Sequence, residues 1–256
     1  MLFLTDLSFL VPVSTMVFGL LAAAFVVWRA KKRDAQQAES MQALAETLHC
    51  TYTPTDSFGL TQQLKGFELF KRERRWFGKG KITHILRGMV GQTDVYMFDY
   101  TYTVQAGNSR KRITQTVFFA NDKNWYLPNF RLRPESLWHK LQAGLGINKD
   151  INFEENPEFS DKFWLKSEFE DLVRQKFTPE LQGFFLEKPP AHLEGSNYYL
   201  IAYKPRKRLS NKDALLFFQH CCQIVQMLHE EGKMELLDLA ELKKEADPIE
   251  IYRTTE

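Results

Sequence analysis

The 256-residue sequence predicts an α+β protein in which an N-terminal transmembrane helix precedes a cytoplasmic domain with an antiparallel sheet and packed helices. Three observations predict this class. A long apolar run near the N-terminus is followed at once by basic residues, three consecutive segments alternate with period two, and several amphipathic segments begin with capping residues. The composition, 44% hydrophobic and 26% charged, excludes collagen, disordered chains and small disulfide-rich scaffolds.

Residues 7–28 contain no charged side chain, and a run of about twenty such residues can cross a bilayer as a helix. No Lys or Arg precedes this run, whereas Arg29, Lys31, Lys32 and Arg33 follow it. A signal peptide shows the opposite charge order, and the positive-inside rule places the basic flank in the cytoplasm. The sequence therefore predicts a single-pass protein of a cell membrane with residues 1–6 outside.

The remainder of the chain divides by composition into three parts. Residues 29–56 form a basic stop and a juxtamembrane helix, residues 57–231 form one α+β domain, and residues 232–256 form an amphipathic helix and a polar tail. The net charge of +2 comes from the basic stop, so nothing indicates a nucleic-acid partner. Cys50, Cys221 and Cys222 lack the spacing of a disulfide framework and suit a reducing compartment.

Period-two alternation predicts three antiparallel strands at residues 81–89, 94–105 and 111–120. In the middle strand, Tyr96, Phe98, Tyr100 and Tyr102 share one face, and Asp99 lies on the other. A further hairpin is predicted at residues 191–203. Strands followed by one long helix are also compatible with a pleckstrin-homology-like half barrel.

Helical spacing and capping residues predict the helices. Asp56 or Ser57 caps a helix at residues 58–70, Thr178 and Pro179 open another, and Ser210 opens the longest. Shorter helices are expected at residues 34–48, 137–141, 167–177 and 234–246. The long helix has an apolar stripe that includes Cys221, which predicts packing across the sheet.

Few residues suggest chemistry, and neither a metal site nor a cofactor motif is recognisable. His220, Cys221 and Cys222 are consecutive on a helix and point in different directions, which favours a structural role. Asp99 projects from a central strand. A carboxylate in that position acts as a general acid or base, or it forms a structural ion pair with an arginine. Arg87 on the preceding strand is the expected partner.

One segment combines basic and aromatic residues and suits an anionic lipid surface. We expect it to contact lipid headgroups through six residues: Lys71, Arg72, Arg74, Arg75, Trp76 and Lys79. Two other basic runs, at residues 110–112 and 204–208, are interpreted as solvated strand edges.

Several short motifs spread over the body resemble those of bacterial single-span membrane-anchored proteins of unknown function. They are Arg87-Gly88 and residues 98–102, 130–135, 156–160 and 177–181. The resemblance implies an inner-membrane location, and it supplies no activity and no catalytic residue.

The sequence therefore favours a membrane-tethered, non-enzymatic binding or assembly module with an unknown protein partner. The alternative is a hydrolase or transferase whose site is assembled from scattered residues. Its first candidates are Asp99 and the segment from Asn156 to Ser160.

Overall fold

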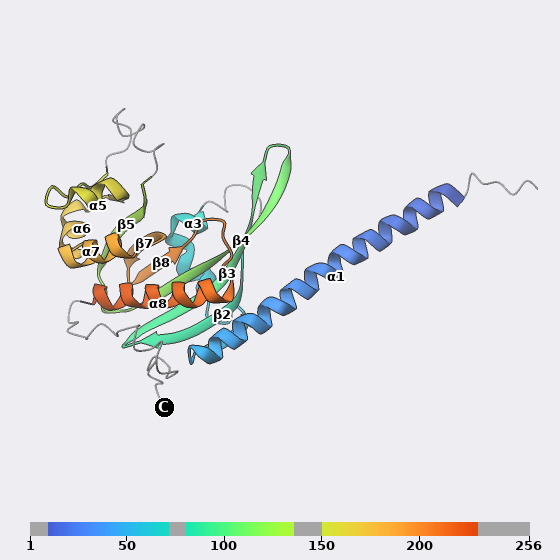
Figure 1. The fold of residues 1–256 in the computed structure, drawn as a ribbon, viewed down its shortest axis with the longest axis horizontal. Helices are drawn as coiled ribbons and strands as arrows, with labels where there is room; N and C mark the ends of the chain where they lie inside the picture. Colours follow the sequence, from blue (N-terminus) through green and yellow to red (C-terminus); the bar gives the residue numbers. More distant parts are fainter. Residues whose placement is uncertain (1–9, 72–79, 136–149, 230–256) are drawn as a thin grey trace, which may run out of the picture. The chain divides into compact units, whose positions relative to one another are not determined.

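A computed structural model describes residues 10–71, 80–135 and 150–229 (Figure 1). The chain divides into two compact units between Ser40 and Met41. The first unit holds most of α1 (Leu10–Thr47), and the second holds the end of α1 and all the strands.

The prediction of a membrane-spanning helix is wrong: among the described residues, no helix is both long and apolar enough to cross a bilayer. Within α1, charged side chains follow the apolar residues from Arg29 onward. The expectations of a single-pass topology, an inner-membrane location and integral membrane partnership are therefore not supported.

The strands of the second unit form one antiparallel sheet with the order β1-β2-β3-β4-β8-β7-β5-β6. This order is not the sequential meander of the expected half barrel, because β4 pairs with β8 and β5 lies between β7 and β6. The strands are β1 (Thr51–Thr55), β2 (Lys81–Val90), β3 (Thr93–Ala106), β4 (Ser109–Asn121), β5 (Leu127–Pro134), β6 (Phe163–Ser167), β7 (His192–Asn197) and β8 (Tyr199–Tyr203).

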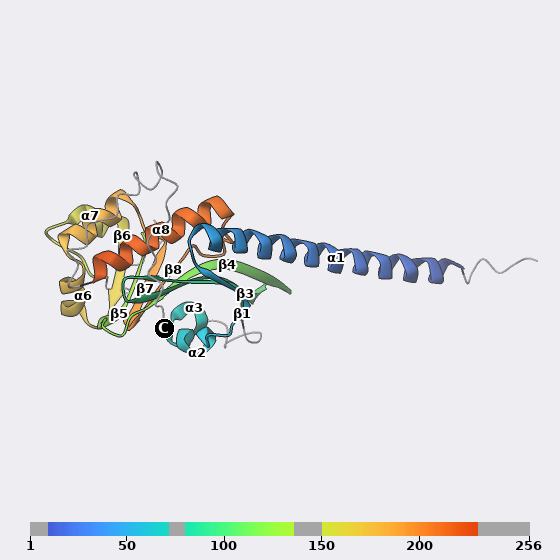
Figure 2. The same cartoon turned by 90° about the horizontal axis from the view of Figure 1, so that it is seen from below.

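The first face of the sheet is covered by α8 (Asn211–Leu228) and by the end of α1 (Figure 2). Phe118 of β4 meets the ring of Phe218 edge-on with centroids 5.7 Å apart. Met41 and Leu44 of α1 are buried in the same core. The predicted juxtamembrane helix is thus continuous with α1, and its last turns belong to the core.

The second face carries the predicted aromatic row, which is covered by three short helices (Figure 2). The ring of Tyr100 lies 4.3 Å from Phe70 and 5.5 Å from Tyr102, measured between centroids. The single helix expected at residues 58–70 is divided into α2 (Leu60–Gln63), a 3₁₀ turn η2 (Leu64–Gly66) and α3 (Glu68–Lys71). Asp56 caps it as predicted, by accepting hydrogen bonds from the backbone N–H groups of Leu60 and Thr61.

Three helices pack beside β5 and β6: α5 (Pro157–Lys162), α6 (Glu170–Lys176) and α7 (Pro179–Glu187). Thr178 caps α7 and Ser210 caps α8, as the sequence predicts. The helix expected at residues 167–177 begins only at Glu170. The helices expected at residues 137–141 and 234–246 lie outside the described residues.

Candidate functional site

The loop between β8 and α8 places one basic run of the sequence beside the other. Beyond the end of β8, this loop follows the edge of β4. The N–H of Arg206 donates to Oε1 of Gln115 (2.9 Å), and the N–H of Thr116 donates to the carbonyl of Lys207 (3.1 Å). Leu209 then donates its N–H to Oγ1 of Thr116 (3.0 Å). Gln115 and Thr116, both buried, therefore fix the path of the loop.

Asp99 anchors the same loop from inside the sheet. Its Oδ2 accepts from Nε of Arg208 (2.8 Å) and lies 2.6 Å from Nη2, and its Oδ1 accepts from the hydroxyl of Thr116 (3.3 Å). The side chain of Asp99 is fully buried. Burial raises the pKa of this carboxyl, and the positive charge of Arg208 opposes that rise. Asp99 is thus held as the buried partner of a cation.

The expected ion pair between Arg87 and Asp99 is wrong. Asp99 is opposite Thr83 in the register of β2 and β3, whereas Arg87 is opposite Tyr96. Arg87 therefore pairs with Asp94, with Nη2 2.9 Å from Oδ1. The cation that reaches Asp99 comes from a loop more than a hundred residues later in the chain.

A pocket of about 370 Å³ opens between this loop and the β3–β4 hairpin. It is lined by Val104, Gln105, Lys111, Arg112, Ile113, Thr114 and Arg206. The lining contains three basic side chains and no acidic one. In the part of the chain that the structure describes, no carboxylate forms an ion pair with Lys111, Arg112 or Arg206. The pocket therefore presents uncompensated positive charge.

Arg206 adopts a left-handed backbone conformation with φ 59°. This region is unfavourable for a residue with a long side chain, and such outliers persist where the surroundings impose them. Here the hydrogen bond from its N–H to Gln115 holds the backbone. The constrained main chain thereby places the exposed side chain of Arg206 in the pocket lining.

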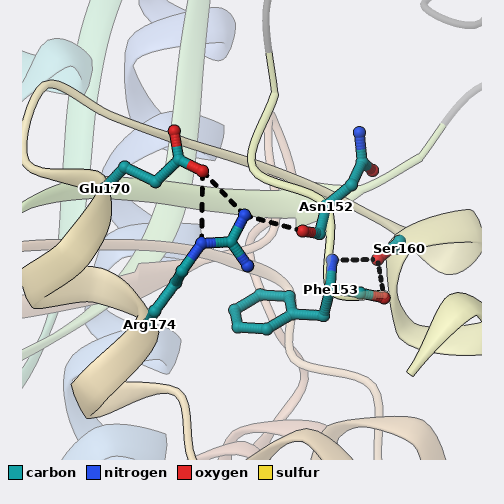
Figure 3. Close-up of polar contacts among 5 residues, drawn as sticks. All are labelled: Asn152, Phe153, Ser160, Glu170 and Arg174. Carbon is teal, nitrogen blue, oxygen red and sulfur yellow. Dashed lines mark hydrogen bonds and ion pairs between the residues drawn. The ribbon is translucent and has the colours of Figure 1, made fainter. Parts of the chain in front are cut away.

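The candidate catalytic segment from Asn156 to Ser160 has structural roles. Oδ1 of Asn156 accepts from the N–H of Phe159 and so caps α5. The hydroxyl of Ser160 accepts from the N–H of Phe153 (2.8 Å) and faces the carbonyl of the same residue (Figure 3). The segment therefore ties α5 to the strand-like stretch before it.

Figure 3 also shows Arg174 beside this segment. Its Nη2 lies 2.6 Å from Oε1 of Glu170 and donates to the carbonyl of Asn152 (2.8 Å). The guanidinium also lies 5.1 Å from the centroid of the Phe153 ring. These contacts join α6 to the same stretch.

His220, Cys221 and Cys222 do not form a nucleophile pair. Burial raises the pKa of both thiols well above the usual value, and burial lowers the pKa of His220 to about 4. The imidazole of His220 stacks on Phe184 instead. Among the described residues, no group of three or more His, Cys, Asp or Glu side chains could hold a metal ion.

The expected lipid-contact segment can be located only at its first residue. Lys71 ends α3 and is exposed. The other five residues of that prediction, Arg72, Arg74, Arg75, Trp76 and Lys79, lie outside the described residues.

The sequence reasoning missed the pocket because it treated the two basic runs as separate solvated edges. Polar residues in the strand pattern were the available signal. Gln115 and Thr116 directly precede the apolar run at residues 117–120 in the same strand, and a buried polar group needs a partner. No pattern in the sequence, however, shows that the partner is the loop at residues 204–210.

The comparisons with known proteins identify no relative that assigns a function. No family model matches the chain, and no curated protein matches it. Among solved structures, the crystal structure of the mycobacterial trehalose monomycolate transport factor A, TtfA, is similar with a TM-score of 0.49 and 11% sequence identity. The similarity covers 77% of this chain and 98% of that chain. A likeness of this degree supports no statement about function.

Proposed function

We propose that this chain is a non-enzymatic binding module that holds an anionic partner in the pocket between the β3–β4 hairpin and the 204–210 loop. One observation is decisive: Lys111, Arg112 and Arg206 converge on a pocket whose lining contains no acid. Exposed cations attract anions, and an anion held between several of them gains charge-assisted hydrogen bonds.

The construction of the site supports binding. Three hydrogen bonds and the Asp99–Arg208 ion pair hold the loop against β4. A loop that is fixed before the ligand arrives loses less conformational entropy when the ligand binds.

The residues first considered for catalysis favour this proposal over the alternative hydrolase or transferase. Asp99 is fully buried and engaged by Arg208, so it has no access to a substrate. Asn156 and Ser160 satisfy backbone groups around α5. None of the three lines the basic pocket.

Binding of labelled polyglutamate to the full chain, followed by fluorescence anisotropy, tests the proposal. A variant with Lys111→Gln, Arg112→Gln and Arg206→Gln should bind at least about tenfold more weakly, a change of ~1.4 kcal/mol. The attraction should also weaken with added salt.

The matched control removes the same number of positive charges elsewhere, by Lys65→Gln, Lys123→Gln and Lys162→Gln. These three side chains are exposed, and none of them lines the pocket. The control should bind within about twofold of the unmodified chain. Equal losses in both variants would show only a general charge effect and would refute the proposal.

A further inference from the structure

The outer half of β4 has an open edge beside the pocket. β4 pairs with β3 along its whole length, from Ser109 to Asn121, but with β8 only from Val117 onward. The loop covers the next position, because Lys207 accepts the N–H of Thr116. Among the described residues, no strand pairs with the remaining edge at residues 111–114. Figure 1 shows this hairpin extending past its neighbouring strands.

The backbone groups on this edge have a defined direction. In an antiparallel strand, alternate residues direct both their N–H and C=O groups to the same side. The N–H of Thr116 points away from β3, toward the loop. The register of β3 and β4 contains no shift, so Thr114 and Arg112 present their backbone groups to the same side.

The hydroxyl contact between Thr101 and Thr114 supports this assignment. Their Oγ1 atoms are 2.8 Å apart. So close an approach is typical of a pair that exchanges no backbone hydrogen bonds, in which the peptide groups point outward. Arg112 and Thr114 also line the pocket, so its wall contains strand edge as well as positive charge.

We propose that the partner is an extended acidic segment of another protein, which adds to the sheet as a strand along residues 111–114 of β4. This inference rests on the proposed function and specifies its ligand. The backbone of the segment bonds to Arg112 and Thr114, and its carboxylates meet the three cations of the pocket. Addition of a strand to an exposed sheet edge is a general mode of peptide recognition.

The distribution of charge suits a strand with acidic residues on either side. Side chains alternate along β4, so Lys111 and Arg112 lie on opposite faces of the ribbon. An added strand therefore meets a cation on each face. The pocket lining contains no aromatic side chain, which argues against single-stranded nucleic acid, because its bases stack on aromatic rings.

The first experiment tests the backbone bonds with modified peptides. The probe is a short capped peptide in which glutamate alternates with aspartate, offered to the full chain. Two further peptides carry N-methyl groups, either on every glutamate or on every aspartate. Because alternate N–H groups point to opposite sides of a strand, one methylated peptide should lose at least about tenfold in affinity and the other should bind nearly as the parent does.

The second experiment removes one backbone donor of the protein. Arg112→Gln removes the charge and keeps the outward N–H, whereas Arg112→Pro removes both. Proline should weaken binding of the peptide at least about tenfold more than glutamine does. Both variants should bind inorganic polyphosphate equally, since that ligand uses no strand edge. Thermal melting of both variants shows whether they remain folded, and the methylated peptides decide the question if the proline variant does not.

The outcomes separate this inference from the proposed function. If both methylated peptides bind like the parent, or if Arg112→Pro and Arg112→Gln are equivalent in a folded chain, strand addition is refuted and anion binding stands. If neither the peptide nor polyphosphate binds in a manner that depends on Lys111, Arg112 and Arg206, both proposals fail. Strand addition is supported if N-methylation of one alternate set of residues lowers the affinity of the peptide and N-methylation of the other set does not.

Discussion

The two halves of β4 belong to one strand but occupy different environments. Residues 117–121 pair with β3 on one side and β8 on the other, and Val117, Phe118 and Phe119 are fully buried. Residues 109–112 pair with β3 and are exposed, and the pairing of β4 with β8 does not extend to them. Gln115 and Thr116, buried and polar, lie between the two halves and hold the loop.

Under the proposed function, stability and recognition are separated along a single strand. The inner half gains free energy from apolar burial on both faces of the sheet. The outer half retains exposed charged side chains, which a well-packed core excludes. Substitutions in the inner half should therefore change the free energy of unfolding, and those in the outer half should change binding.

The largest expected effect is that of Phe118→Ala. Phe118 is fully buried and packs against Phe218, so its truncation should lower the free energy of unfolding by about 3–5 kcal/mol. Chemical denaturation measures this change. Val104→Ala, on the outer ribbon, should cost less than about 1 kcal/mol. Similar losses of unfolding free energy for Phe118→Ala and Val104→Ala would contradict the proposed difference between the two halves of β4.

The next effect is at the ion pair between Asp99 of β3 and Arg208 of the loop that follows β8. Arg208→Met leaves the carboxylate of Asp99 buried without its cation and should destabilise the chain by about 3 kcal/mol at neutral pH. Asp99→Asn should cost less, because the side chain of Arg208 is 32% exposed and can turn to water.

The Arg208→Met variant should also show a distinctive pH dependence. Without the guanidinium, burial raises the pKa of Asp99 further above its unfolded value. The folded state then binds more protons than the unfolded state between those two pKa values, so stability falls as pH rises through that interval. Denaturation should show that the deficit relative to the unmodified chain shrinks as the pH is lowered toward the unfolded pKa of about 4. A deficit independent of pH would contradict this account.

A smaller effect is expected from Thr116→Val. The substitution keeps the shape of the side chain but leaves the N–H of Leu209 without its acceptor, at a cost of about 1–2 kcal/mol. Affinity for polyglutamate should fall as well, since the loop that carries Arg206 is held less firmly. Unchanged affinity in a destabilised variant would show that the loop does not need this anchor.

The smallest effect on stability is expected in the outer half. Lys111→Gln and Arg112→Gln alter exposed side chains and should each change the free energy of unfolding by less than about 0.5 kcal/mol. Differential scanning calorimetry of the two variants checks this. A larger loss would show that the charges stabilise the ribbon itself.

The strands that alternate clearly could be predicted from the sequence, and those defined by distant partners could not. Period two located β2, β3 and β4 to within a few residues. β5 and β6 were missed, because β5 is bounded by Pro134 and pairs with β6 across a long connection. Helix beginnings at Thr178 and Ser210 were predicted because a cap is a local hydrogen bond.

The candidate site shows the same division. Asp99 was singled out correctly as a buried carboxylate, but its partner was assigned to a neighbouring strand because only local pairs can be inferred from one sequence. Arg208 reaches it through the pairing of β4 with β8. The apolar run near the N-terminus was interpreted by its length, but among the described residues no helix is long and apolar enough to cross a membrane.

The pairing of β4 with β8 also has a consequence for how the chain folds. The sheet consists of two parts, β1–β4 and β5–β8, which are each contiguous in sequence and meet only at this pairing. Until β8 is in place, the edge of β4 is open along its full length, including the apolar residues from Val117 to Ala120. Charged residues that flank such a segment oppose intermolecular association during folding. Residues 110–112 are therefore expected to protect the nascent sheet from self-association, before they take part in any binding by the finished one.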